Sequence, residues 1–174
     1  VLDQNEDCET EGKLTLYYNF TACLERDNVP VHAESAAYNM AEGLRGQIHN
    51  VRVWTEARTN GQLQTQSNLL LSGNETGLLS YYPMDEAGGN ILKDKARGLN
   101  LKMNGGTWLL PEGRGLMLNG TNSYLKLNSG SSVVADKETD YTIELWFKGD
   151  KGNRDATLLA SGRADGTDWG GSEN

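Results

Sequence analysis

Residues 138–144 hold the group of carboxylates whose spacing comes nearest to that of a catalytic pair. Glycoside hydrolysis needs two carboxyl groups that flank the scissile bond, about 5 Å apart in retaining enzymes. On a strand this requirement gives a pattern such as E-x-D-x-x-E, with the acids on one face. Glu138 and Asp140 match the beginning of the pattern, but position 143 is Ile and Glu144 stands alone on its face. The sequence therefore predicts that the chain is not an enzyme.

Motifs for nucleophilic catalysis and phosphate binding are also missing. His32 and His49 have no G-x-S-x-G motif beside them, and the Gly-rich turns lack the Lys and the helix of a phosphate loop. Cys8 and Cys23 lie in acidic surroundings, which disfavour a reactive thiolate. In an oxidising compartment they could form a disulfide, and two ordinary thiols are the alternative. Zinc is not expected, because the two histidines lack ligand-like spacing.

Two tryptophans have the surroundings of a carbohydrate site. Such a site offers an aromatic face for the sugar ring with hydrogen-bonding groups next to it. Trp146 lies between Glu144 and Lys148 on the polar face of its strand, and Trp169 follows Asp168 in a Gly-rich loop. For Trp146 the alternative is a packing role beneath a loop. The candidate ligand-binding residues are therefore Trp146, Glu144, Asp168 and Trp169.

The composition favours short strands over long helices. The length of 174 residues fits one domain, and 21 Gly against 3 Pro indicate many turns between short elements. An apolar share of 37% is low for a large core but sufficient for a thin sandwich of two sheets. The net charge of −8 repels nucleic acid and anionic membrane surfaces, so neither is expected as a partner.

Membrane insertion is not expected either. No apolar run reaches the roughly 18 residues of a membrane span, and we expect no signal peptide within these residues. The acidic composition fits a secreted or cell-surface protein. Because the chain starts at Val1 without a Met, we expect it to be a processed or excised segment.

The stretch GQIHNVRVWTEARTNGQL predicts a strand followed by a short helix. Strict alternation along the strand cannot place Ile48 and Val51 on the same face. A one-residue bulge at residues 49–50 would do so. We expect the polar side chains of this strand, His49 and Arg52, to be solvated.

Helix signals follow this strand. Thr59 is the expected N-cap, and Gln62 stands three residues later as its capping-box partner. Trp54 and Trp108 each close a strand-turn motif and are expected to be structural. Asp94 is expected to cap a turn.

Two further segments have clear strand patterns. In residues 115–127, leucines alternate inward on both sides of Asn119–Gly120, which predicts a hairpin. In residues 141–148, every second residue from Tyr141 to Phe147 is apolar, as on a half-buried strand. Together these patterns predict an all-β fold, an antiparallel β-sandwich of the jelly-roll kind.

The same segments carry a family resemblance. GLRGQIHNVRVWTEART resembles the closing strand and turn of laminin-G-like, or concanavalin-A-like, jelly-roll domains. GNETGLLSYYPMDEAGGNILKDKARGLNLKMNGGTW resembles the segment that follows such a strand in multidomain bacterial surface proteins. GLMLNGTNSYLKL followed by YTIELWFK looks like the first strands of such a domain, and GKLTLYYN is similar to a strand late in it. The resemblance covers most of the chain.

The order of these motifs departs from that of a single domain. Motifs of a second half precede motifs of a first half, which implies a window cut from a tandem array. Residues 1–72 would then end one jelly roll, residues 73–174 would begin the next, and the junction would lie near Ser72–Asn74. The alternative is one circularly permuted sandwich, because the termini of sandwiches often lie close together.

The resemblance also implies a function. It suggests a non-catalytic binding or adhesion module of a secreted or cell-surface protein, with a glycan or an extracellular protein as partner. It is closest to surface proteins of gliding or type IX-secreting bacteria, which adds secretion machinery as a partner. The alternatives are a structural spacer repeat and a glycoside hydrolase, since laminarinase-type hydrolases share the jelly roll. Related domains often bind calcium, and Asp165 and Asp168 are the candidate ligands here, with a solvated loop as the alternative.

Overall fold

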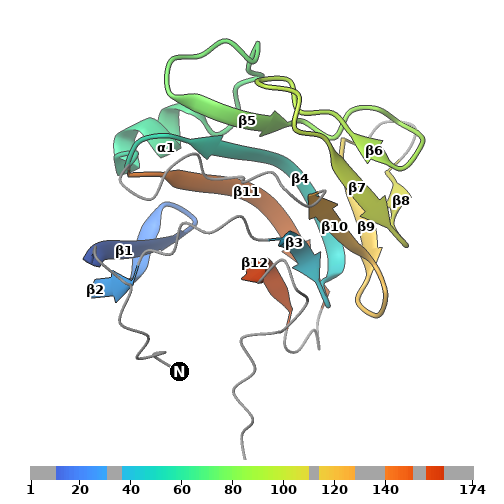
Figure 1. Cartoon of the computed structure of the whole chain (residues 1–174), viewed down its shortest axis with the longest axis horizontal. Coiled ribbons are helices and arrows are strands. Elements are labelled where there is room, and N and C mark those ends of the chain that lie inside the picture. Colours follow the sequence, from blue (N-terminus) through green and yellow to red (C-terminus); the bar gives the residue numbers. More distant parts are fainter. Residues whose placement is uncertain (1–10, 31–36, 110–113, 128–139, 151–155, 163–174) are drawn as a thin grey trace, which may run out of the picture.

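The computed structural model describes residues 11–30, 37–109, 114–127, 140–150 and 156–162 (Figure 1). Strands dominate these ranges, with one short helix among them. In chain order the elements are β1 (Glu11–Tyr18), β2 (Thr21–Pro30), β3 (Ala37–Glu42), β4 (Arg45–Trp54), α1 (Asn60–Gln66), β5 (Leu78–Tyr82), β6 (Ile91–Leu92), β7 (Leu101–Asn104), β8 (Thr107–Trp108), β9 (Leu116–Asn119), β10 (Tyr124–Leu127), β11 (Thr142–Gly149) and β12 (Thr157–Gly162).

The described strands pair in antiparallel fashion into two larger sheets and a hairpin. The first larger sheet has the order β12-β3-β10-β7-β6. The second has the order β11-β4-β9-β8, and β5 also pairs with β4. The β1–β2 hairpin pairs only with itself among the described strands. The predicted all-β antiparallel sandwich is confirmed.

The apolar faces of the two larger sheets enclose the core. Leu116 and Leu118 of β9 face it from one sheet, and Leu125 and Leu127 of β10 face it from the other. Burial of these alternate side chains is the main force that holds the layers together. The buried cluster consists of Met40, Ala41, Leu44, Ile48, Val51, Val53, Tyr82, Met84, Leu92, Leu101, Met103, Leu116, Leu118, Leu125 and Leu127.

Both larger sheets contain strands from either side of the expected junction near Ser72–Asn74. β4 pairs with β5, β9 and β11, and β3 pairs with β10 and β12. Such pairing is what one permuted sandwich requires. The assignment of residues 1–72 and 73–174 to two domains of a longer parent stays a prediction, as does the jelly-roll connectivity.

β4 has the bulge that its sequence predicts. Its register against β11 shifts by one residue between His49 and Arg52. Asn50, inside the shift, has a φ of 57°, a left-handed conformation that Asn tolerates better than most residues. The extra residue brings Ile48 and Val51 onto the same face, and both are fully buried.

The predicted hairpin over residues 115–127 is wrong. β9 belongs to the sheet of β4, whereas β10 belongs to the sheet of β3. Inward alternation is the same for two paired strands and for two strands that face each other across a core, so the pattern cannot distinguish them. The Asn119 Oδ1 accepts hydrogen bonds from the backbone N–H groups of Thr121 (2.9 Å) and Asn122 (3.1 Å). This turn takes the chain from one sheet to the other.

α1 begins with the predicted capping box. The Thr59 hydroxyl accepts a hydrogen bond from the Gln62 backbone N–H, and the Gln62 side chain accepts one from the Thr59 N–H. Figure 1 shows α1 at the end of the sheet where β4 ends and β11 begins. The capped helix thus fixes the direction of the chain that follows β4.

The β1–β2 hairpin lies next to β11 (Figure 1). Its turn residues, Asn19 and Phe20, both have positive φ, as a tight two-residue turn requires. The Phe20 ring meets that of Trp146 edge-on at a centroid distance of 6.3 Å. Tyr18 lies 6.5 Å from Phe147, again between ring centroids. The hairpin therefore touches the sandwich through aromatic rings.

Candidate ligand-binding site

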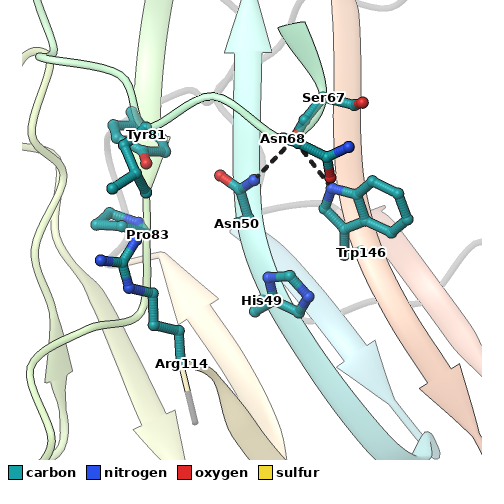
Figure 2. Close-up of a pocket in the computed structure, with 9 residues that line it drawn as sticks. His49, Asn50, Ser67, Asn68, Tyr81, Pro83, Arg114 and Trp146 are labelled. Carbon is teal, nitrogen blue, oxygen red and sulfur yellow. Dashed lines mark hydrogen bonds between the residues drawn. The ribbon is translucent and has the colours of Figure 1, made fainter. Parts of the chain in front are cut away.

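A pocket of about 410 Å³ lies where β4, β5 and β11 run side by side. Figure 2 shows Tyr81, Pro83 and Arg114 on one side and Ser67, Asn68 and Trp146 on the other, with His49 and Asn50 between them. The lining residues are His49, Asn50, Ser67, Asn68, Leu70, Tyr81, Pro83, Arg114 and Trp146. A volume of this order accommodates a small ligand.

Two aromatic rings from neighbouring strands lie together in this pocket. His49 of β4 and Trp146 of β11 are paired directly across the sheet. Their rings are nearly parallel, with an interplanar angle of 6° and centroids 6.2 Å apart. His49 is half-buried, so the prediction that it is solvated is wrong. The bulge after His49 keeps it on the outer face of the sheet, opposite Trp146.

Trp146 packs against a neighbouring ring and also lines the pocket. Its ring is half-buried against Phe20, and it also lines the pocket. The indole Nε1–H donates a hydrogen bond of 3.3 Å to the Ser67 carbonyl. Its orientation is therefore fixed by packing and by a hydrogen bond. A role of Trp146 in ligand binding stays a prediction.

Arg52 holds the wall of the pocket in place. Its guanidinium donates hydrogen bonds to the carbonyls of Gln66 (2.7 Å), Ser67 (3.1 Å) and Leu69 (2.6 Å). The residue is 1% exposed, so the prediction that it is solvated is wrong. The last residue of α1 and the chain that follows it present these carbonyls to the guanidinium. A buried Arg is tolerated here because several acceptors satisfy its N–H groups.

Glu144, another predicted ligand-binding residue, is absent from the pocket lining. It stands opposite Arg52 in the β4–β11 pairing, with 3.7 Å between their charged groups. Its carboxylate also accepts a 2.6 Å hydrogen bond from the Trp54 Nε1–H and lies 3.7 Å from Arg58. Burial raises the pKa of Glu144, and the two arginines and the indole oppose that shift. Its described contacts are those of a buried charge cluster.

Trp54 belongs to this cluster and is structural, as predicted. It is 1% exposed, and the Arg58 guanidinium lies 3.8 Å above its ring centroid. The same guanidinium pairs with Glu56 at 2.7 Å. These contacts join the start of α1 to the end of β4.

Tyr81 is held in the pocket by Asp94, which caps a turn as predicted. The Asp94 carboxylate accepts hydrogen bonds from the backbone N–H groups of Tyr81 (2.8 Å), Ala96 (2.9 Å) and Leu99 (3.2 Å). The Tyr81 ring also lies 5.9 Å from the Arg52 guanidinium, a cation–π contact. Both contacts fix the ring at the side of the pocket.

Four lining side chains have polar groups without a hydrogen-bond partner among the described residues. They are the imidazole of His49, the amide of Asn68, the hydroxyl of Tyr81 and the guanidinium of Arg114. Each can donate or accept a hydrogen bond with a ligand. The pocket therefore combines the ring pair of His49 and Trp146 with several free polar groups.

Several predicted site residues lie outside the described residues. These are the calcium candidates Asp165 and Asp168, the aromatic candidate Trp169 and the cysteine Cys8. Its expected disulfide partner, Cys23, is exposed, and its Sγ lies 3.4 Å from the Leu16 carbonyl oxygen. The described part of the chain contains no group of three or more His, Cys, Asp or Glu residues that could hold a metal ion. The disulfide and the calcium site stay predictions.

Among the lining residues, only Trp146 is predicted as a binding residue from the sequence. His49 could have been found, because the predicted bulge and the predicted strand at 141–148 place it on an outer face. Tyr81, Asn68 and Arg114 could not, because their meeting depends on which distant strands pair. No local pattern distinguishes them from other polar or aromatic residues.

Comparison of the chain with family models, curated proteins and solved structures found no match. The resemblance to laminin-G-like domains therefore rests on the motifs alone and stays a prediction. No helix in the described residues is long and apolar enough to cross a membrane.

Proposed function

We propose that this chain is a non-catalytic binding or adhesion module that recognises a glycan through the pocket between β4, β5 and β11. The observation that carries the proposal is the ring pair of His49 and Trp146, which is surrounded by free polar groups. An extracellular protein is the second ligand class that the sequence predicts.

The chemistry of the lining supports a glycan. One side of a sugar ring is a surface of C–H groups that packs on aromatic rings, while its hydroxyls need donors and acceptors at the edge. The rings of His49 and Trp146 offer the aromatic surface. The amide of Asn68 and the hydroxyl of Tyr81 offer the hydrogen-bond donors and acceptors. A site prepared by packing and hydrogen bonds loses little entropy when a ligand binds.

The described lining of the pocket supports the proposal of binding without bond cleavage. Glycoside hydrolysis needs two carboxyl groups beside the scissile bond. The described lining of the pocket includes no Asp or Glu. The nearby Glu144 is engaged by Trp54, Arg52 and Arg58.

The proposed setting is a laminin-G-like region of a larger secreted or cell-surface protein. The motif resemblance and the acidic composition support this setting. A structural spacer is the alternative, and it requires no ligand.

A glycan array tests the proposal. The chain should bind at least one class of glycan, and Trp146→Ala should remove that binding because it removes half of the ring pair. Trp108→Ala is the matched control, since Trp108 lies outside the pocket and donates its Nε1–H to Gly89. Circular dichroism should show that both variants are folded. If the wild-type chain binds no glycan, the spacer is favoured.

A further inference from the structure

The pocket and the whole molecule differ in charge. The chain has a net charge of −8, yet the described lining of the pocket includes one Arg and neither Asp nor Glu. That Arg114 is exposed and has no ion-pair partner among the described residues. An unpaired guanidinium beside a pocket without carboxylates is suited to an anionic group.

The backbone places Arg114 at the pocket. Gly115 donates its N–H to the Met84 carbonyl at 2.9 Å, which links the start of β9 to the chain after β5. A Cβ on Gly115 would lie 2.7 Å from the Ile48 carbonyl oxygen and 2.9 Å from the His49 Cβ, so the two backbones are in close contact. Figure 2 shows the Arg114 side chain extending from this point toward Pro83.

Arg114, and not His49, provides the positive charge in the pocket. Burial lowers the pKa of the His49 imidazole, so the ring is mostly neutral at pH 7. A neutral imidazole can exchange hydrogen bonds with hydroxyl groups while its ring stays beside Trp146. Next to this ring pair, the Asn68 amide and the Tyr81 hydroxyl can form hydrogen bonds with further hydroxyl groups of a ligand. The pocket thus has one cation, the ring pair of His49 and Trp146, and uncharged polar groups.

We propose that the ligand is an acidic saccharide whose uronic-acid carboxylate pairs with Arg114 while its ring packs on His49 and Trp146. This inference rests on the function proposed above. A guanidinium matches a carboxylate because its parallel N–H groups meet both oxygens. The polar groups between the carboxylate and the rings would receive the hydroxyls of the same sugar. A sulfate ester offers similar charge and is distinguished by experiment.

Titration calorimetry with three oligosaccharides tests the inference. The probes are an oligogalacturonate, the same oligosaccharide with its carboxylates methyl-esterified, and a sulfated galactan of equal length. A charge-assisted pair of this kind corresponds to a change in Kd of about tenfold or more. We therefore expect the oligogalacturonate to bind at least about tenfold more tightly than its ester. Arg114→Gln should reduce its affinity to that of the ester, and Arg45→Gln, an exposed Arg outside the pocket, should not.

The outcomes separate this inference from the function on which it rests. Equal affinities for the acid and its ester, or full affinity in Arg114→Gln, would overturn the acidic ligand and leave a neutral glycan. Binding of the sulfated galactan alone would overturn the assignment of a carboxylate as the group that pairs with Arg114. If neutral glycans bind to the wild-type chain and are lost in Trp146→Ala, the binding function stands without the acidic ligand. If no glycan of either kind binds, the proposed function itself fails.

Discussion

At the scale of single residues, Arg52 joins three parts of the molecule. It extends from β4, donates to three carbonyls at the end of α1 and just after it, and faces Glu144 on β11. Arg52→Lys keeps the charge but loses the planar set of donors, which leaves buried carbonyls without partners. We expect the free energy of unfolding to fall by about 3 kcal/mol, measured by urea denaturation.

Arg45→Lys is the control for Arg52→Lys. Its side chain is exposed and pairs with Asp150 at 3.4 Å on the surface. Exposed pairs contribute about 1 kcal/mol or less, so this variant should match the wild type within that margin. A loss of equal size in both variants would contradict the role of Arg52.

His49 makes stability depend on pH. Because burial lowers its pKa below the ordinary value of 6.5, the unfolded chain takes up the proton first as the pH falls. The His49 contribution to stability is thus greatest above pH 6.5 and is lost as the pH falls through the lowered value. His49→Gln cannot titrate, so its unfolding free energy should fall less between pH 8 and pH 5. Parallel pH curves for the two proteins would show that His49 is not the cause.

At the scale of elements, two glycines should respond to Ala in opposite ways. Gly46 in β4 has a φ of 152°, and a Cβ there would lie 2.1 Å from the Lys148 carbonyl oxygen. Gly46→Ala must push β4 away from β11, and we expect a loss of about 3 kcal/mol or more. Gly61→Ala in α1 meets no atom within 4 Å and should stabilise the chain by about 0.5–1 kcal/mol.

Thermal melts of both glycine variants test this contrast. The two substitutions add the same atom, so opposite shifts in Tm would show that strand pairing decides the effect at Gly46. Two small shifts of the same sign would contradict the close approach of β4 and β11.

The sequence predicts elements that depend on neighbouring residues. The bulge of β4 followed from the conflict between Ile48 and Val51, and the start of α1 followed from Thr59 and its capping partner. The hairpin at Asn119 was mispredicted, because an inward leucine pattern does not say which sheet a strand joins. The candidate site was predicted only at Trp146 for the same reason. Arg114 and Trp146 line the same pocket because distant strands pair, and no local pattern encodes that pairing.

At the scale of the whole molecule, the β1–β2 hairpin is nearly independent of the sandwich. Its backbone pairs only within itself among the described strands, and aromatic contacts reach β11 at Phe147 and Trp146. Each aromatic pair contributes about 1 kcal/mol. Removal of residues 1–30 should therefore lower the unfolding free energy by about 2 kcal/mol and leave the cooperative transition in place. Loss of the transition in calorimetry would show that the hairpin is part of the core fold.

The pairing of β4 with β11 also has a consequence for biosynthesis. The Trp54 indole donates a hydrogen bond to the Glu144 carboxylate across these strands, and the two residues are 90 positions apart in the chain. During synthesis, β4 leaves the ribosome long before β11 is made. One edge of β4 and one edge of β3 therefore stay unpaired until β11 and β12 emerge. Contacts this distant make folding slow. A nascent chain that stalls before residue 142 would present unpaired strand edges to neighbouring chains and would therefore be prone to aggregate.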